Sequence, residues 1–111
     1  MKPLKTGLKG EQKMDKYKLP INYNDLTWKE RSEVRKQYIR KQNGKCMYCN
    51  CDLDSEPSED VKRKAKRIDW NIFPKNFLKY PIHLQHNHNT GMTEGVVHAL
   101  CNAVMWQYEG R

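Results

Sequence analysis

Four residues in two pairs have the types and the spacing of a metal site. Cys46 and Cys49 are separated by two residues, and His98 and Cys101 repeat that spacing further along the chain. A Cys-x2-Cys turn lets two thiolates reach one ion, and Cys3His is a common ligand set for structural zinc. Cys51 is an alternative to His98, but three ligands within six residues would crowd one turn. The alternative without a metal is a set of buried free thiols and a hydrogen-bonded histidine. We expect structural zinc at Cys46, Cys49, His98 and Cys101.

A second candidate group contains three histidines within six positions. His83, His86 and His88 lie on a segment with period-two alternation, and Asn102 follows the second metal pair directly. In strand geometry His83 and Gln85 face one way, and His86 and His88 face the other. At least one imidazole can therefore point into a cleft beside the helix near Asn102. Imidazole is suited to proton transfer near neutral pH. The alternative without chemistry is a hydrogen-bonded turn histidine and a helix-capping asparagine.

Helix and strand patterns must position both groups. Thr27 and Glu30 form a capping box, and the apolar spacing that follows predicts a helix from Trp28 to Asn43. The C-terminal part predicts, in order, a strand from Ile82, a turn at Asn89-Thr90-Gly91, a returning strand over 95–98 and a helix over 100–108. We therefore expect an α+β fold.

Length and composition allow one small polar domain. The chain has 111 residues, of which 37% are hydrophobic and 31% charged, so the core is thin and a metal would supply missing stability. We expect a basic, flexible arm over 1–25 and a domain over 26–111 with a charged insert at about 52–80. No apolar run approaches the roughly 20 residues of a membrane span, and the basic start lacks the apolar stretch of a signal peptide. We expect an intracellular, cytoplasmic protein without membrane contact.

The positive charge lies in the first part of the chain. Residues 1–45 contain 13 Lys and Arg and 5 Asp and Glu, which gives a net charge of +8, whereas 46–111 contain eight of each. Such a distribution suits contact with nucleic-acid phosphates, although a solvated charged tail has the same composition. The candidate phosphate contacts are Arg31, Arg35 and Arg40 on the first helix and Lys64 and Arg67 in a second basic run.

Taken together, these motifs resemble the HNH endonucleases with the ββα-metal fold, most closely the phage recombination endonuclease VII type. The matching residues are Cys46-x2-Cys49, the run from His83 to His88, and the run from Gly95 to Asn102. The resemblance covers roughly residues 28–109. It implies a zinc-stabilised domain that hydrolyses DNA phosphodiester bonds, leaves 5′-phosphate ends and has a phage origin.

The resemblance also implies residue roles. His86 would be the general base that activates water, and Asn102 would bind a catalytic divalent ion such as Mg²⁺ or Mn²⁺. His88 would contact or protonate the scissile phosphate region, or cap the turn. Gln85 stands where endonuclease VII has an aspartate ligand, so the ion would be held by Asn102 alone with waters and phosphates, or with help from His83 or Gln85.

Some residues of this chain differ from the endonuclease VII pattern, and these differences leave other functions open. Where endonuclease VII has an acid on the final helix, this chain has Met105, and His98 with Cys101 replace the usual cysteine pair. One alternative is a non-catalytic, zinc-stabilised nucleic-acid-binding module, for which Gln85 and Met105 are the strongest arguments. Another is a resolvase that cuts branched DNA.

Overall fold

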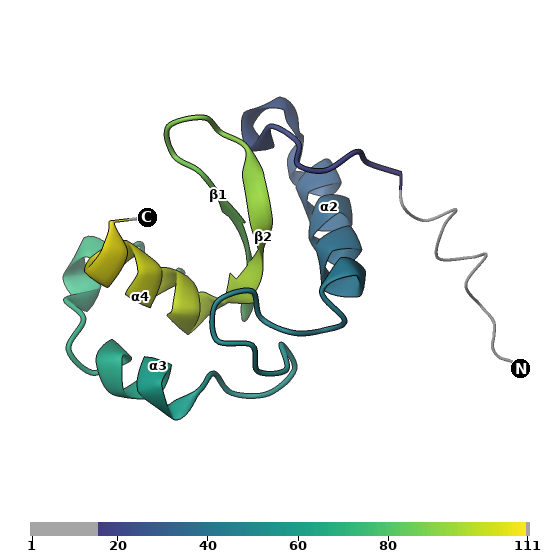
Figure 1. Ribbon diagram of the computed structural model, residues 1–111. Helices are drawn as coiled ribbons and strands as arrows, with labels where there is room; N and C mark the ends of the chain where they lie inside the picture. The colour runs from purple at the N-terminus through teal and green to yellow at the C-terminus, as the bar shows by residue number, and fades with distance from the viewer. Residues whose placement is uncertain (1–15, 111) are drawn as a thin grey trace, which may run out of the picture.

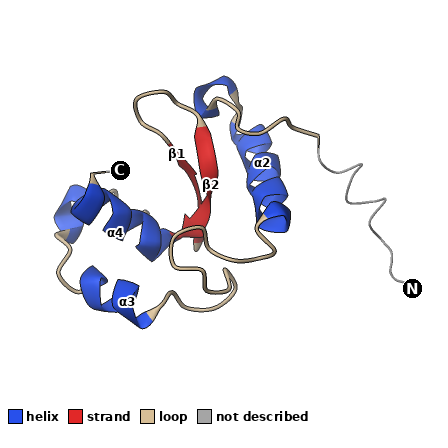
Figure 2. Cartoon of the chain, in the orientation of Figure 1, coloured by secondary structure: helices blue, strands red, loops and turns tan. Residues whose placement is uncertain are grey.

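The fold is α+β, with a two-stranded sheet between two helices. The computed structural model describes residues 16–110. Its elements are η1 (Tyr23–Asp25), α2 (Trp28–Lys41), α3 (Glu59–Ala65), η2 (Trp70–Ile72), β1 (Ile82–His86), β2 (Thr93–His98) and α4 (Ala99–Glu109). The sheet lies between α2 and α4, and α3 packs against α4 (Figures 1 and 2). Within residues 16–110, no helix has the length and apolar character needed to cross a membrane.

The hairpin forms where the alternation and the turn residues predict it. β1 and β2 pair antiparallel, with His83 opposite Val97, and a register shift between Gln85 and His86 interrupts the ladder. The side chain of Asn87 accepts hydrogen bonds from two backbone N–H groups of the turn that follows. Gly91 ends that turn with φ +81°, a conformation that favours glycine. The register shift lies beside His86, so it sets where this side chain points.

Helix α2 begins and ends close to the predicted bounds, and it packs against the sheet. Thr27 and Glu30 make both hydrogen bonds of the capping box. Tyr38 is buried and its hydroxyl lies 2.8 Å from the hydroxyl of Thr93 on β2. The amide of Gln42 donates to the Val96 carbonyl and accepts from the Val96 N–H. The end of α2 is thereby bound to the outer edge of β2.

The charged insert contributes to the core. Helix α3 forms where the insert's acidic and basic runs meet, and Ser58 caps the helix by accepting from the Val61 N–H. Val61, Ala65 and Ile68 are buried because their i, i+4, i+7 spacing faces α4, while the charges lie on the opposite side. The charges of the insert leave a loop or a short helix open, and the structure has a helix over Glu59–Ala65 that is part of the packed domain.

The predicted arm over 1–25 needs correction where the structure describes it. Tyr17, Leu19, Ile21 and Tyr23 all pack against the hydrophobic core. Ile21 exchanges hydrogen bonds with Thr93, through the backbone at 2.9 Å and through the threonine hydroxyl at 3.0 Å. Residues 16–25 therefore belong to the folded domain rather than to an arm. Their apolar residues alternate at period two, but the run is short, is interrupted by Pro20 and lies beside many charges, which explains the error. Residues 1–15 lie outside the described residues.

Removal of this segment tests its contribution. A chain that begins at residue 26 loses the contacts of Leu19, Ile21 and Tyr23, so we expect its free energy of unfolding to be lower by about 3 kcal/mol than that of a chain that begins at residue 16. Urea unfolding followed by circular dichroism measures the difference. Equal midpoints for the two chains would show that residues 16–25 are an arm after all.

Candidate functional site

Two distant segments bring four ligand atoms together. Cys46 and Cys49 lie on the turn after α2, whereas His98 ends β2 and Cys101 lies in the first turn of α4. The three Sγ atoms and one imidazole nitrogen all lie within 4.8 Å of one another. We refer to these four residues as the Cys/His cluster. They are placed to hold a metal ion, as the paired spacing predicts.

The geometry and hydrogen bonds of His98 fit a tetrahedral ion. Its Nδ1 lies 3.5 Å from Sγ of Cys49 and 3.5 Å from Sγ of Cys101. Ligand atoms around tetrahedral zinc are about 3.5 to 3.8 Å apart, given Zn–N and Zn–S bonds of about 2.1 and 2.3 Å. The Nε2 atom lies 2.9 Å from the Asp52 carbonyl, which only accepts, so Nε2 carries the proton and the Nδ1 lone pair faces the sulfurs. The arrangement is compatible with a structural zinc.

The turn around Cys46 stabilises a thiolate. A hydrogen bond from the Cys101 thiol, followed by backbone groups that include the N–H of Cys49, lowers the pKa of Cys46 to about 4. Burial raises the pKa of Cys51, and its sulfur is not among the four clustered ligand atoms. A thiolate is the form that binds metal. The choice of His98 over Cys51 as the fourth ligand agrees with this geometry.

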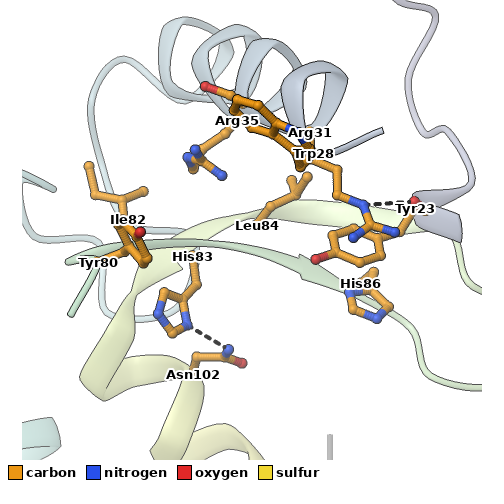
Figure 3. A pocket seen from close by; sticks show the side chains of 11 residues that line it. Tyr23, Trp28, Arg31, Arg35, Tyr80, Ile82, His83, Leu84, His86 and Asn102 are labelled. Carbon is orange, nitrogen blue, oxygen red and sulfur yellow. Dashed lines mark hydrogen bonds between the residues drawn. The ribbon is translucent and has the colours of Figure 1, made fainter. Parts of the chain in front are cut away.

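A cleft of about 520 Å³ lies along β1, between α2 and the start of α4. Figure 3 shows Arg31 and Arg35 on the α2 side and Asn102 on the α4 side, with β1 between them. His83 and His86 also line it. The structure thus places two predicted phosphate contacts, the predicted base and the predicted ion ligand in one cavity, which we call the β1 cleft.

Stacking fixes the ring of His86. The imidazole lies parallel to the ring of Tyr23, with centroids 4.0 Å apart and an interplanar angle of 9°. The Arg31 guanidinium lies 3.8 Å from the other side of the Tyr23 ring and donates to the Tyr23 carbonyl at 3.2 Å (Figure 3). Burial, with a further contribution from the nearby His88, lowers the pKa of His86, so the ring is neutral at pH 7. The sequence reasoning missed Tyr23 because it assigned this residue to the arm.

His83 contacts Asn102 directly. Its Nε2 lies 3.0 Å from the Phe77 carbonyl, so this nitrogen donates and Nδ1 is an acceptor. The Asn102 Nδ2 lies 3.1 Å from that Nδ1 and donates to it (Figure 3). Both ring nitrogens of His83 are therefore engaged, which does not agree with its tentative assignment as an ion ligand. His83 instead orients the Asn102 amide, whose Oδ1 is not used in this bond.

His88 lines a second cleft of about 250 Å³, which Asn102 also lines. Its exposed ring lies 4.8 Å from that of His86, measured between centroids. Phe73, Phe77 and Trp106 form most of the remaining wall. Asn102 lines both clefts, so the cleft of His86 and the cleft of His88 share the predicted ion ligand.

Two of the positions that depart from the endonuclease VII pattern, Gln85 and Met105, are buried. The side chain of Gln85 is 2% exposed, donates to the His86 carbonyl and lines neither cleft. Met105 is fully buried in the core. No carboxylate lines either cleft within the described residues. The structure therefore does not bring Gln85 into contact with an ion at Asn102.

The remaining predicted phosphate contacts lie elsewhere. Arg40, Lys64 and Arg67 do not line the β1 cleft. Lys64 pairs with Asp60 at 3.4 Å on the surface of α3, and Arg67 is exposed just beyond that helix. Only Arg31 and Arg35 of the five share the cavity with the histidines.

Comparison of this chain with protein-family models, with curated proteins and with solved structures finds no match.

Two serine substitutions test the ligand set. Cys101→Ser removes a ligand atom, so we expect the loss of bound zinc together with several kcal/mol of folding stability. Cys51→Ser leaves the Cys/His cluster intact, and we expect it to keep zinc and the wild-type unfolding midpoint. Zinc content by mass spectrometry of the native protein, with urea unfolding, measures both effects. Equal losses in the two variants would show that Cys51 is a ligand.

Proposed function

We propose that this protein is a metal-dependent endonuclease of the HNH type, in which β1, β2 and α4 form the ββα-metal unit around a structural zinc. It hydrolyses DNA phosphodiester bonds and leaves 5′-phosphate ends. The observation that supports this most directly is the β1 cleft, where His86 and Asn102 share a cavity with Arg31 and Arg35. A base, an oxygen ligand for a hard cation and two guanidinium groups are the parts that phosphodiester hydrolysis requires.

The charge of the β1 cleft supports an anionic substrate. Neither Arg31 nor Arg35 forms an ion pair with a carboxylate of residues 16–110. Guanidinium groups without a carboxylate partner can bind phosphate oxygens, and Arg31 would do so through the N–H groups other than the Nε–H that donates to the Tyr23 carbonyl. The DNA backbone would therefore lie along α2 with one phosphate near β1.

His86 has the properties of a general base. Its ring is neutral at pH 7 because burial lowers its pKa, so it can accept a proton from water. Stacking on Tyr23 fixes the ring plane, and this limits the directions from which water can donate. In the proposed reaction the water proton moves to His86, the water oxygen bonds to phosphorus, the P–O3′ bond breaks, and the released 3′ oxygen takes a proton from a second water.

Asn102 is the proposed ligand for the catalytic ion. The hydrogen bond to His83 uses the amide nitrogen and leaves the amide oxygen for a cation. A bound divalent ion such as Mg²⁺ or Mn²⁺ would stabilise charge on the phosphate and on the leaving 3′ oxygen. Because no carboxylate of the described residues lines the clefts, the substrate phosphate must supply much of the ion's coordination.

The same lack of carboxylates favours a second candidate, a zinc-stabilised nucleic-acid-binding module that does not cut. In that case Arg31 and Arg35 bind phosphate, and His86 and Asn102 only shape the β1 cleft. The two candidates differ in whether a divalent ion and His86 are required for strand cleavage. A resolvase would differ from both by cutting branched DNA faster than linear duplex.

Nicking of a supercoiled plasmid tests the nuclease proposal. We expect wild-type protein to nick the plasmid when Mg²⁺ or Mn²⁺ is added. It should not nick when a chelator removes the weakly bound divalent ions. His86→Ala should reduce the rate by at least about 100-fold, because it removes the base. The variant should retain zinc and DNA affinity, which controls for folding. Wild-type protein that binds DNA but cuts neither the plasmid nor branched or single-stranded DNA with either ion would favour the binding module.

A pair of arginine variants tests the assignment of the DNA surface. Arg35→Ala removes a phosphate contact in the β1 cleft. The plot of the logarithm of the DNA association constant against the logarithm of the salt concentration should then become less steep, by about 0.7 to 0.9. Arg67→Ala removes the same charge from a surface outside the cleft, and its effect should be much smaller. Fluorescence anisotropy over a salt series measures both. If Arg67→Ala has the larger effect, DNA binds along α3 instead.

A further inference from the structure

Two large aromatic side chains lie exposed at the β1 cleft. Trp28 is 82% exposed and Tyr80 is 61% exposed, and both line the cleft with Arg31 and Arg35 (Figure 3). Trp28 is the first residue of α2, and Tyr80 lies two residues before β1. They reach the cavity from two different segments of the chain, the start of α2 and the loop before β1.

The other tryptophans are packed differently. Trp70 and Trp106 both contact the ring of Phe73, at centroid distances of 5.5 and 5.8 Å. Trp28 makes no ring contact with any residue of 16–110. Its exposure means that it adds little to the core, while its indole face is open to a ligand in the cleft.

Aromatic faces beside cationic groups favour unpaired nucleotides. Grooves that bind single strands combine positive charge along the backbone with aromatic rings on which bases stack. In a continuous duplex both faces of a base are covered by its neighbours, so a ring at the edge of a cleft cannot reach them without unstacking. Arg31 and Arg35 supply the charge here, and Trp28 and Tyr80 supply the rings.

We propose that the β1 cleft binds single-stranded DNA, with a base stacked on Trp28 and the adjoining phosphates on Arg31 and Arg35. Tyr80 provides a second ring for a neighbouring base. This inference rests on the part of the proposed function that assigns DNA to the β1 cleft, because it names the form of DNA that would enter the same site. The preferred substrate is then DNA with unpaired nucleotides rather than continuous duplex.

Binding of labelled 20-nucleotide DNA tests the proposal in the full, zinc-loaded chain. At fixed salt and without a catalytic ion, we expect wild-type protein to bind the single strand more tightly than the duplex of the same sequence. Trp28→Ala should weaken single-strand binding about 10-fold and should affect duplex binding much less. Trp28→Phe should restore most of the affinity, because a phenyl ring also stacks.

Trp70→Ala is the matched control. Trp70 is 36% exposed, contacts Phe73 and lines neither cleft, so its loss should leave single-strand affinity unchanged. Equal affinity for single strand and duplex in wild-type protein, or unchanged single-strand binding by Trp28→Ala, would overturn the proposal. Tighter binding to RNA of the same sequence would overturn the assignment of DNA.

The two proposals fail separately. A protein that nicks plasmid in a His86-dependent manner but binds single strands without any contribution from Trp28 retains the proposed function and loses this inference. A protein that never cuts DNA but binds single strands through Trp28 loses the nuclease proposal and retains this one.

Discussion

The arrangement of the site depends on the contact between two chain segments at the Cys/His cluster. Cys46 and Cys49 follow α2, and His98 and Cys101 join β2 to α4, so the cluster connects the elements on the two sides of the sheet. Asn102 is the residue after Cys101, so its position follows from that of the cluster. In a chain with 37% hydrophobic residues, a bound ion here would replace packing that a thin core cannot provide.

The opposite end of the hairpin is held by packing and hydrogen bonds instead. The Tyr23 N–H donates to the Gly91 carbonyl at 2.7 Å, and an added Cβ at Gly91 would lie 2.7 Å from the side chain of Asn22. This close approach places the Tyr23 ring against His86. Asn102 and His86 are therefore positioned by independent constraints, one on each side of β1. A change at either end would alter the geometry of the β1 cleft without touching the other group.

Local patterns were sufficient to predict α2, the hairpin, α4 and the Cys/His cluster. The capping box at Thr27, the alternation of β1 and the repeated two-residue spacing each depend on neighbours in the sequence, and the structure agrees with all three. The contacts of Tyr23 with His86 and of His83 with Asn102 depend on packing between elements, and no local pattern encodes them. The basic residues of α3 and α2 are similar in composition, so the sequence does not distinguish them. The fold shows that Arg31 and Arg35 of α2 line the β1 cleft together with the histidines.

The absence of carboxylates from the clefts of the described residues links ion binding to substrate binding. Gln85 is buried, and Met105 packs in the core, so a neutral amide at Asn102 is the proposed ligand from the protein. Mg²⁺ retains several waters and is usually bound through carboxylates and substrate phosphates. With no carboxylate, the ion would be held weakly until a phosphate enters between Arg35 and Asn102. Under the proposed function the arginines then act twice, because they bring in the phosphate that also completes the ion site. The same cationic cleft serves a binding module equally well, so the chemistry of the protein depends on whether a cation accompanies the bound phosphate.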